Sequence, residues 1–128
     1  MIIDPNTFER FNAVLTGVIV PRPIAFVSTM APDGVVNLAP YSFFNAVSYS
    51  HVVFSSSRHV GNKSKDTLRN IEETGQFVVN IVVDPIADAM NATAAEYPEG
   101  VDEFEIAGLT HAPSQIVKPP RVAESPVN

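Results

Sequence analysis

The fold follows from residues 24–38, which read Ile24-Ala-Phe-Val-Ser-Thr-Met-Ala-Pro-Asp-Gly-Val-Val-Asn-Leu38. Residues 24–29 are rich in β-branched and aromatic side chains, and two prolines precede them in the place of a strand lead-in. Pro32-Asp33-Gly34 is a turn signal, after which residues 35–38 are predicted to return antiparallel. We therefore expect a β-hairpin as the first element of an antiparallel sheet.

Two further stretches are predicted as strands. Residues 51–55 read as a short buried strand, and residues 77–83 are the most apolar run in the chain. Such a run predicts burial on both faces, where Asn80 would need a hydrogen-bond partner. Short strands outnumber helices, so we expect a mainly β protein with peripheral helices, built as a β-barrel.

Three helices are predicted around these strands. The first covers residues 6–15, capped by Asn6 or Thr7. The second has Ser64 as its N-cap and ends at Gly75, with Leu68 and Ile71 facing inward. The third begins at Asp84-Pro85, with Asp84 as its cap, and runs to about residue 95. Residues 97–109 read as an acidic connection, and the prolines after residue 110 predict an irregular arm that wraps the fold.

Composition excludes several classes of function. The 128 residues suit one domain, numbered 1–128, and the formal charge of −6 argues against nucleic-acid or anionic-membrane partners. There is no cysteine, and the three histidines are too widely spaced for a metal site. We expect a cytoplasmic protein, because no apolar run has the length of a membrane span. Any redox chemistry must come from an organic cofactor.

Positive charge is concentrated in residues 55–70. Arg58, Lys63, Lys65 and Arg69 are four of the eight basic residues in the chain. Hydroxyl groups and a glycine lie among them, and a helix is predicted to begin there, so the segment suits a small anion such as phosphate. The alternative is a solvated loop whose charges pair with nearby acids.

A second candidate segment is Asn37-Leu-Ala-Pro-Tyr-Ser-Phe-Phe-Asn45. Pro40 is expected to break the strand, which would free backbone groups of residues 39–45 for a flat heterocycle. For the side chains of Phe43 and Phe44 the favoured interpretation is that they are ordinary core residues beside a bulge. A third candidate is Ser28-Thr29 at a strand end, where the common role of hydroxyls is to cap backbone groups. Acids such as Glu103 look solvated, so hydrolase chemistry ranks low and no catalytic side chain is assigned.

Five segments together resemble the flavin reductase-like, FMN-binding split-barrel proteins, a group that includes flavoredoxin and NAD(P)H:flavin oxidoreductases. They are Arg22-Pro-Ile-Ala-Phe-Val-Ser-Thr29, Asn37-Leu-Ala-Pro-Tyr-Ser-Phe-Phe-Asn45, Lys65-Asp-Thr-Leu-Arg-Asn70, Phe77-Val-Val-Asn80 and Asp102-Glu-Phe-Glu-Ile-Ala-Gly-Leu109. The resemblance runs in order from about residue 8 to the Pro-Pro-Arg-Val-Ala-Glu-Ser-Pro segment at 119–126.

The resemblance implies an antiparallel split barrel, a homodimer and non-covalently bound FMN. It implies that the flavin phosphate is held by a set of hydroxyl and basic side chains: Ser55, Ser57, Arg58, Lys65 and Thr67. It implies isoalloxazine contacts from two other segments: Ser28, Thr29, Ala39, Pro40, Tyr41, Ser42 and Asn45. The implied activity is an NAD(P)H-dependent flavin reductase in which the nicotinamide passes hydride to flavin N5 and a free flavin or redox protein receives the electrons.

The chain departs from the family pattern in its length. Similar proteins continue past the Ala-Glu-Ser-Pro motif into strands that close the barrel, so residues 1–128 are expected to form the N-terminal two-thirds of the family domain and an incomplete barrel. Two alternatives to the reductase therefore stay open. One is a flavoredoxin-like FMN electron carrier without its own nicotinamide site, and the other is a non-catalytic truncated member of the family.

Overall fold

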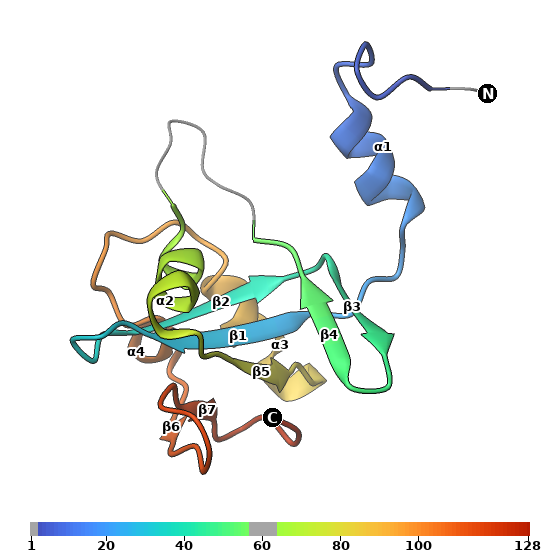
Figure 1. The fold of residues 1–128 in the computed structure, drawn as a ribbon. Coiled ribbons are helices and arrows are strands. Elements are labelled where there is room, and N and C mark those ends of the chain that lie inside the picture. Colours follow the sequence, from blue (N-terminus) through green and yellow to red (C-terminus); the bar gives the residue numbers. More distant parts are fainter. Residues whose placement is uncertain (1–2, 57–63) are drawn as a thin grey trace.

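The centre of the structure is a three-stranded antiparallel sheet with the strand order β2-β1-β5 (Figure 1). The structure is a computed structural model that describes residues 3–56 and 64–128. Strands β1 (Ala25–Met30) and β2 (Val36–Tyr41) form a hairpin around the turn at Gly34, and β5 (Val78–Ile81) pairs with the other side of β1. The hairpin predicted from residues 24–38 is confirmed.

The core lies on both faces of this sheet, because side chains alternate between the faces along β1. On one face Phe26 packs in a cluster with Leu38 and Phe104. On the opposite face Val27 lies in a cluster with Tyr41. Helix α2 covers the Val27 face, and the later helices with the C-terminal segment cover the Phe26 face (Figure 1). Strand β1 is therefore buried almost throughout.

Pro40 does not break the strand, contrary to the sequence prediction. It is paired opposite Phe26 inside β2, which continues to Tyr41. The reason is that β2 is an edge strand in the described sheet, where a residue without an N–H group is tolerated. The interruption comes instead at residues 42–43, immediately before β3 (Phe44–Ser48).

Strands β3 and β4 (His51–Phe54) form a separate two-stranded sheet. The strand predicted at residues 51–55 is present as β4, but its predicted burial is wrong, because residues 51–53 are exposed in this ribbon. Only its base packs on the body: the Phe54 ring lies 5.1 Å from the Tyr41 ring and 5.3 Å from the Phe77 ring. A two-stranded ribbon has no third strand or helix over its face, so its apolar side chains stay in contact with solvent.

Strand β5 is shorter and less buried than the apolar run predicted. Val78 and Asn80 are buried, whereas Ile81 is exposed, because β5 lies at the edge of the described sheet. The expectation that Asn80 has partners is confirmed. Its Nδ2 donates to the Phe26 carbonyl at 2.9 Å, and its Oδ1 accepts from the Val122 N–H at 2.8 Å.

The first helix, α1 (Phe11–Val18), begins later than predicted. Neither Asn6 nor Thr7 caps it, because the Asp4 carboxylate accepts from both the backbone N–H and the amide of Asn6 and holds the preceding residues in a turn. Helix α1 has no buried residue and stands apart from the central sheet (Figure 1).

Helix α2 (Asp66–Thr74) ends at Gly75 as predicted, in a left-handed conformation with φ of 67°. Its N-cap is Lys65 and not Ser64, and no side chain caps it. Thr67 and Asn70 face inward in place of Leu68 and Ile71. The inward face of α2 is polar because it meets polar side chains of the sheet. A prediction that places the apolar residues of the helix inward therefore gives the wrong orientation.

Residues 84–92 form a 3₁₀ turn η1 (Asp84–Ile86) followed by helix α3 (Ala87–Ala92). Asp84 lies inside the turn η1 and does not cap it. Helix α3 ends before the predicted residue 95, at the point where the Thr93 hydroxyl donates to the Met90 carbonyl. The acidic connection contains helix α4 (Glu103–Ala107), whose first turn is capped by Asp102.

The C-terminal segment packs on the body and is not wholly irregular. Strands β6 (His111–Ala112) and β7 (Arg121–Val122) pair antiparallel, and the Ile81 N–H donates to the Val127 carbonyl. Within the described ranges no helix combines the length and hydropathy that crossing a bilayer requires.

Candidate functional site

A cleft of about 870 Å³ lies between the end of β2, the start of α2 and residues 93–99. We call it the α2–β2 cleft. Its volume falls in the range of pockets for small organic ligands. Five of the predicted site residues line it and are therefore brought together by the fold: Ala39, Pro40, Tyr41, Lys65 and Thr67.

One end of the α2–β2 cleft suits an anion. The Lys65 ammonium lies 5.6 Å from the centre of the Tyr41 ring, beside the first turn of α2, which no side chain caps. The Ser64 hydroxyl, which also lines the cleft, is buried without a hydrogen-bond partner among the described residues. Orphan N–H groups at a helix start, a hydroxyl and a cation are the donor set that binds phosphate. The donors present here therefore fit the phosphate of FMN.

Ser28 and Thr29 lie behind the cleft and do not line it. Both are fully buried in β1. The Ser28 hydroxyl donates to the Pro120 carbonyl, and the Thr29 hydroxyl accepts from the Asn70 amide at 3.1 Å. These bonds tie the sheet to the C-terminal segment and to α2, and the Ser28 hydroxyl satisfies a backbone carbonyl, as hydroxyls commonly do.

The other predicted site residues that the structure describes, Ser42, Asn45 and Ser55, are not among those lining the cleft. Ser42 lies in the interruption between β2 and β3, and the Asn45 side chain accepts from the Ala46 N–H on the exposed ribbon. Ser55 is exposed, and its N–H donates to the Phe43 carbonyl at 2.9 Å. Ser57 and Arg58 lie outside the described residues. The assignment of all these residues to flavin binding stays a prediction.

Glu103 is a cleft residue that the sequence reading missed. It is 8% exposed, and its Oε2 accepts from the Leu38 N–H of β2 at 2.9 Å. The expectation that it is solvated is wrong, because Asp102 accepts from the Phe104 N–H, caps α4 and directs Glu103 against β2. Burial raises the pKa of the Glu103 carboxyl above its ordinary value. The available signal was Asp102, a residue type common at helix N-caps, placed two residues before the apolar Phe104.

Asn37 is a second missed residue of the cleft. Its amide donates to the Thr67 hydroxyl at 2.8 Å, which joins β2 to the first turn of α2. With the Asn70–Thr29 bond, this contact makes the interface between α2 and the sheet polar. The sequence places Asn37 in a candidate segment but shows nothing of this pairing, which spans 30 positions.

We expect Glu103→Ala to lower the free energy of unfolding by about 1–3 kcal/mol, because the buried Leu38 N–H loses its acceptor. Glu103→Gln retains an oxygen acceptor and should be closer to the wild type at neutral pH. Chemical denaturation of the three proteins measures the difference. Equal stability of the alanine variant and the wild type would contradict this role.

The same residue predicts a dependence of stability on pH. The folded pKa of Glu103 is raised, so the native state binds more protons than the unfolded chain between the two pKa values. Its contribution to stability is therefore fully present below the unfolded pKa and is lost as pH rises through the folded pKa. Glu103→Gln should remove this decline. The free energy of unfolding is measured by denaturation at several pH values. The same change of this free energy with pH in the wild type and in Glu103→Gln would rule out the role of Glu103.

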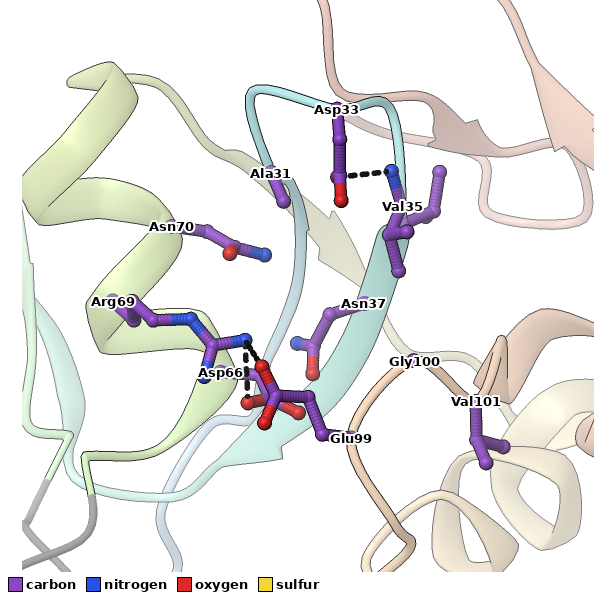
Figure 2. Close-up of a pocket in the computed structure, with 11 residues that line it drawn as sticks. Ala31, Asp33, Val35, Asn37, Asp66, Arg69, Asn70, Glu99, Gly100 and Val101 are labelled. Atoms are coloured by element: carbon purple, nitrogen blue, oxygen red, sulfur yellow. Dashed lines mark hydrogen bonds and ion pairs between the residues drawn. The ribbon is translucent and has the colours of Figure 1, made fainter.

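A smaller cavity of about 120 Å³ adjoins the cleft, between the β1–β2 turn, α2 and residues 99–101. Arg69 of α2 lines both spaces, and Figure 2 shows its guanidinium held between the carboxylates of Asp66 and Glu99. Asn70, which is 2% exposed, faces this cavity, and its Oδ1 has no partner among the described residues.

Comparison with known families shows which family the chain belongs to. The flavin reductase like domain matches residues 17–128. The chain belongs to this family. Membership of this flavin reductase-like chain confirms the resemblance seen in its five sequence segments.

The relatives of this flavin reductase-like chain are longer. It is 44% identical over 129 residues to an uncharacterized protein of Aquifex aeolicus, across 99% of this chain and 66% of that protein. The solved nitrilotriacetate monooxygenase component B of Bacillus cereus is 42% identical, with a TM-score of 0.89, across 98% of this chain and 63% of the other. The chain thus spans less than two thirds of the length of these relatives.

The fold class is confirmed by a further solved structure. A Shewanella frigidimarina protein described as a flavin reductase with a split barrel domain superposes with a TM-score of 0.73 at 25% identity, across 98% of this chain and 64% of that one. The flavin reductase-like chain has the same mainly β architecture. Its three described sheets are open, consistent with an incomplete barrel.

Proposed function

We propose that this chain binds FMN in the α2–β2 cleft and acts as an NAD(P)H-dependent flavin reductase. The observation that supports it most is the convergence of three features at one end of the cleft. They are the Lys65 ammonium, the start of α2 that no side chain caps, and the Ser64 hydroxyl, which has no partner in the described part of the chain. A single phosphate group would satisfy all three.

In this proposal the side chains position the cofactor. Lys65 and Thr67, with Arg58, Ser55 and Ser57 from the preceding part of the sequence, hold the phosphate. The end of β2 at residues 39–41 supplies a wall against which the flavin ring system lies, next to the Tyr41 ring. Bound FMN supplies the redox chemistry, which is acceptance of hydride from a nicotinamide and delivery of electrons to an acceptor, so no side chain has to act as an acid or base.

The proposal extends to the assembly. We propose a cytoplasmic homodimer whose acceptor is free flavin or a redox protein. Exposed apolar patches mark contact surfaces, and the β3–β4 ribbon carries one that supports association. Its exposed apolar side chains are Val47, Tyr49, Val52 and Val53.

The test is flavin content followed by turnover. The chain is loaded with FMN, desalted and measured for stoichiometric flavin absorbance, and oxidation of NADH and NADPH is then followed with added FMN. We expect retained flavin and turnover above the rate with free FMN alone. Retained flavin without turnover would leave the electron-carrier alternative in place of the reductase, and the absence of both would leave the non-catalytic alternative.

A further inference from the structure

Two apolar elements, helix α1 and the β3–β4 ribbon, lack a covering layer in the described part of the chain. Helix α1 has no buried residue, and residues 45–53 of the ribbon are all exposed, so neither element covers the other within one chain. An isolated helix of eight residues is marginal in water, and a two-stranded ribbon needs a helix or further strands over its face. Each element therefore needs a partner of the kind that the other one provides.

Both elements project beyond the same end of the central sheet (Figure 1). Arg22 connects them, because its guanidinium donates to the Thr16 carbonyl of α1 at 2.8 Å and lies 5.3 Å from the centre of the Phe43 ring, directly before β3. Exposed apolar side chains of both elements therefore belong to one region of the surface. They are Val18, Ile19 and Val20 at the end of α1, and Val47, Tyr49, Val52 and Val53 on the ribbon.

This region carries no formal charge, although the chain has 14 acidic and 8 basic residues. None of them falls in residues 11–21 or 34–57. Depletion of charged residues, with aromatic side chains present, is typical of the core of a protein interface. Two copies that each have a net charge of −6 repel each other, so their association is favoured through surfaces without charge.

We infer that α1 of one copy packs on the β3–β4 ribbon of a second copy, and that the second copy returns the same contact. A two-fold axis closes this arrangement, because one interface then pairs helix with ribbon twice and covers all four elements. The inference rests on the proposed homodimer and names the surfaces that form it.

The pattern of the ribbon indicates which of its faces receives the helix. Ala46 lies opposite Val52, so their side chains share a face. The same face carries Phe44 and Phe54 at the base of the ribbon, where both pack against the core cluster that contains Tyr41. A helix laid on this face extends an existing core.

Sedimentation velocity over a range of protein concentrations measures the association. We expect a dimer, and Val18→Asp and Val52→Asp should each raise its dissociation constant at least about tenfold, because symmetry places each buried carboxylate twice in the interface. Val18 is 69% exposed and Val52 50% exposed in one chain, so circular dichroism should show that both variants fold. The control is Ile116→Asp, which adds the same charge at a position that is 96% exposed and belongs to neither element. It should leave the dissociation constant unchanged.

Cross-linking tests the pairing itself, because the chain contains no cysteine. Val18→Cys and Val52→Cys are introduced in two differently tagged copies, which are mixed and treated with a short bis-maleimide. A product that carries both tags forms only between copies. We expect this product to be abundant, whereas replacing Val52→Cys with Ile116→Cys should reduce it to background.

A monomeric wild type, an unchanged dissociation constant in both aspartate variants, or a cross-link no more abundant than with Ile116→Cys overturns the inference. Flotation of the monomer with phosphatidylcholine vesicles also overturns it, because the apolar region would then meet a membrane. Flavin retention and turnover are measured on the same samples. A monomer that retains FMN and turns over counts against this interface and not against the reductase, and a dimer without the cross-link leaves the proposed homodimer in place through other surfaces.

Discussion

Replacing Arg58 and Lys65 together with alanine is expected to weaken FMN binding by roughly 100-fold or more. Each cation is proposed to make a charge-assisted hydrogen bond with the phosphate, and such bonds contribute about 1.5–3 kcal/mol. Loss of two such bonds removes at least about 3 kcal/mol of binding free energy. Since each ~1.4 kcal/mol corresponds to a tenfold change in affinity, the expected loss is roughly 100-fold. Quenching of flavin fluorescence on titration with the protein measures the dissociation constant.

Riboflavin separates the phosphate contact from a general loss of the site. Because riboflavin has no phosphate, its weaker affinity should change little in the double variant. The charge-matched control is Arg10→Ala with Lys118→Ala, which removes one Arg and one Lys from exposed positions outside the α2–β2 cleft. This control should keep wild-type FMN affinity. Unchanged FMN affinity in the Arg58/Lys65 variant would show that the phosphate is held elsewhere.

Asn80→Leu is expected to lower the free energy of unfolding by about 3–5 kcal/mol, enough to unfold a marginal domain. Asn80 is fully buried, and its amide connects three parts of the fold. It donates to the Phe26 carbonyl and the Ser28 hydroxyl of β1 and accepts from the Val122 N–H of β7. Leucine has a similar volume, so the loss comes from buried polar groups left without partners.

Denaturant titration followed by circular dichroism measures this change. The control is Asn91→Leu, which makes the same substitution at an exposed position of α3 and should stay within about 0.5 kcal/mol of the wild type. Wild-type stability of the Asn80 variant would mean that the C-terminal segment does not depend on this residue for its attachment to the sheet.

The sequence predicts the parts of the fold that depend on local chemistry. The central hairpin follows from a β-rich run, the turn at Gly34 and a second β-rich run, and the end of α2 follows from Gly75, whose positive φ favours glycine. Pro40 misleads because whether a proline interrupts a strand depends on that strand being at an edge, and this is a property of the whole sheet.

The candidate site is predicted only where its residues share a segment. Lys65 and Thr67 follow from the basic window, and Ala39–Tyr41 from the polar and aromatic segment. Glu103 cannot be found in this way, because an acidic run looks solvated until the cap at Asp102 and the bond to Leu38, 65 positions away, are known. Likewise, the burial of Ser28 depends on a C-terminal contact 92 positions away.

The native mass of the 128-residue chain, recorded with FMN and with riboflavin at equal concentration, tests FMN binding in the α2–β2 cleft most directly. We expect one FMN for each chain and much lower occupancy by riboflavin, because the phosphate supplies the charge that Lys65 and the start of α2 are placed to bind. No bound FMN, or equal occupancy by riboflavin, would contradict a phosphate-anchored flavin site.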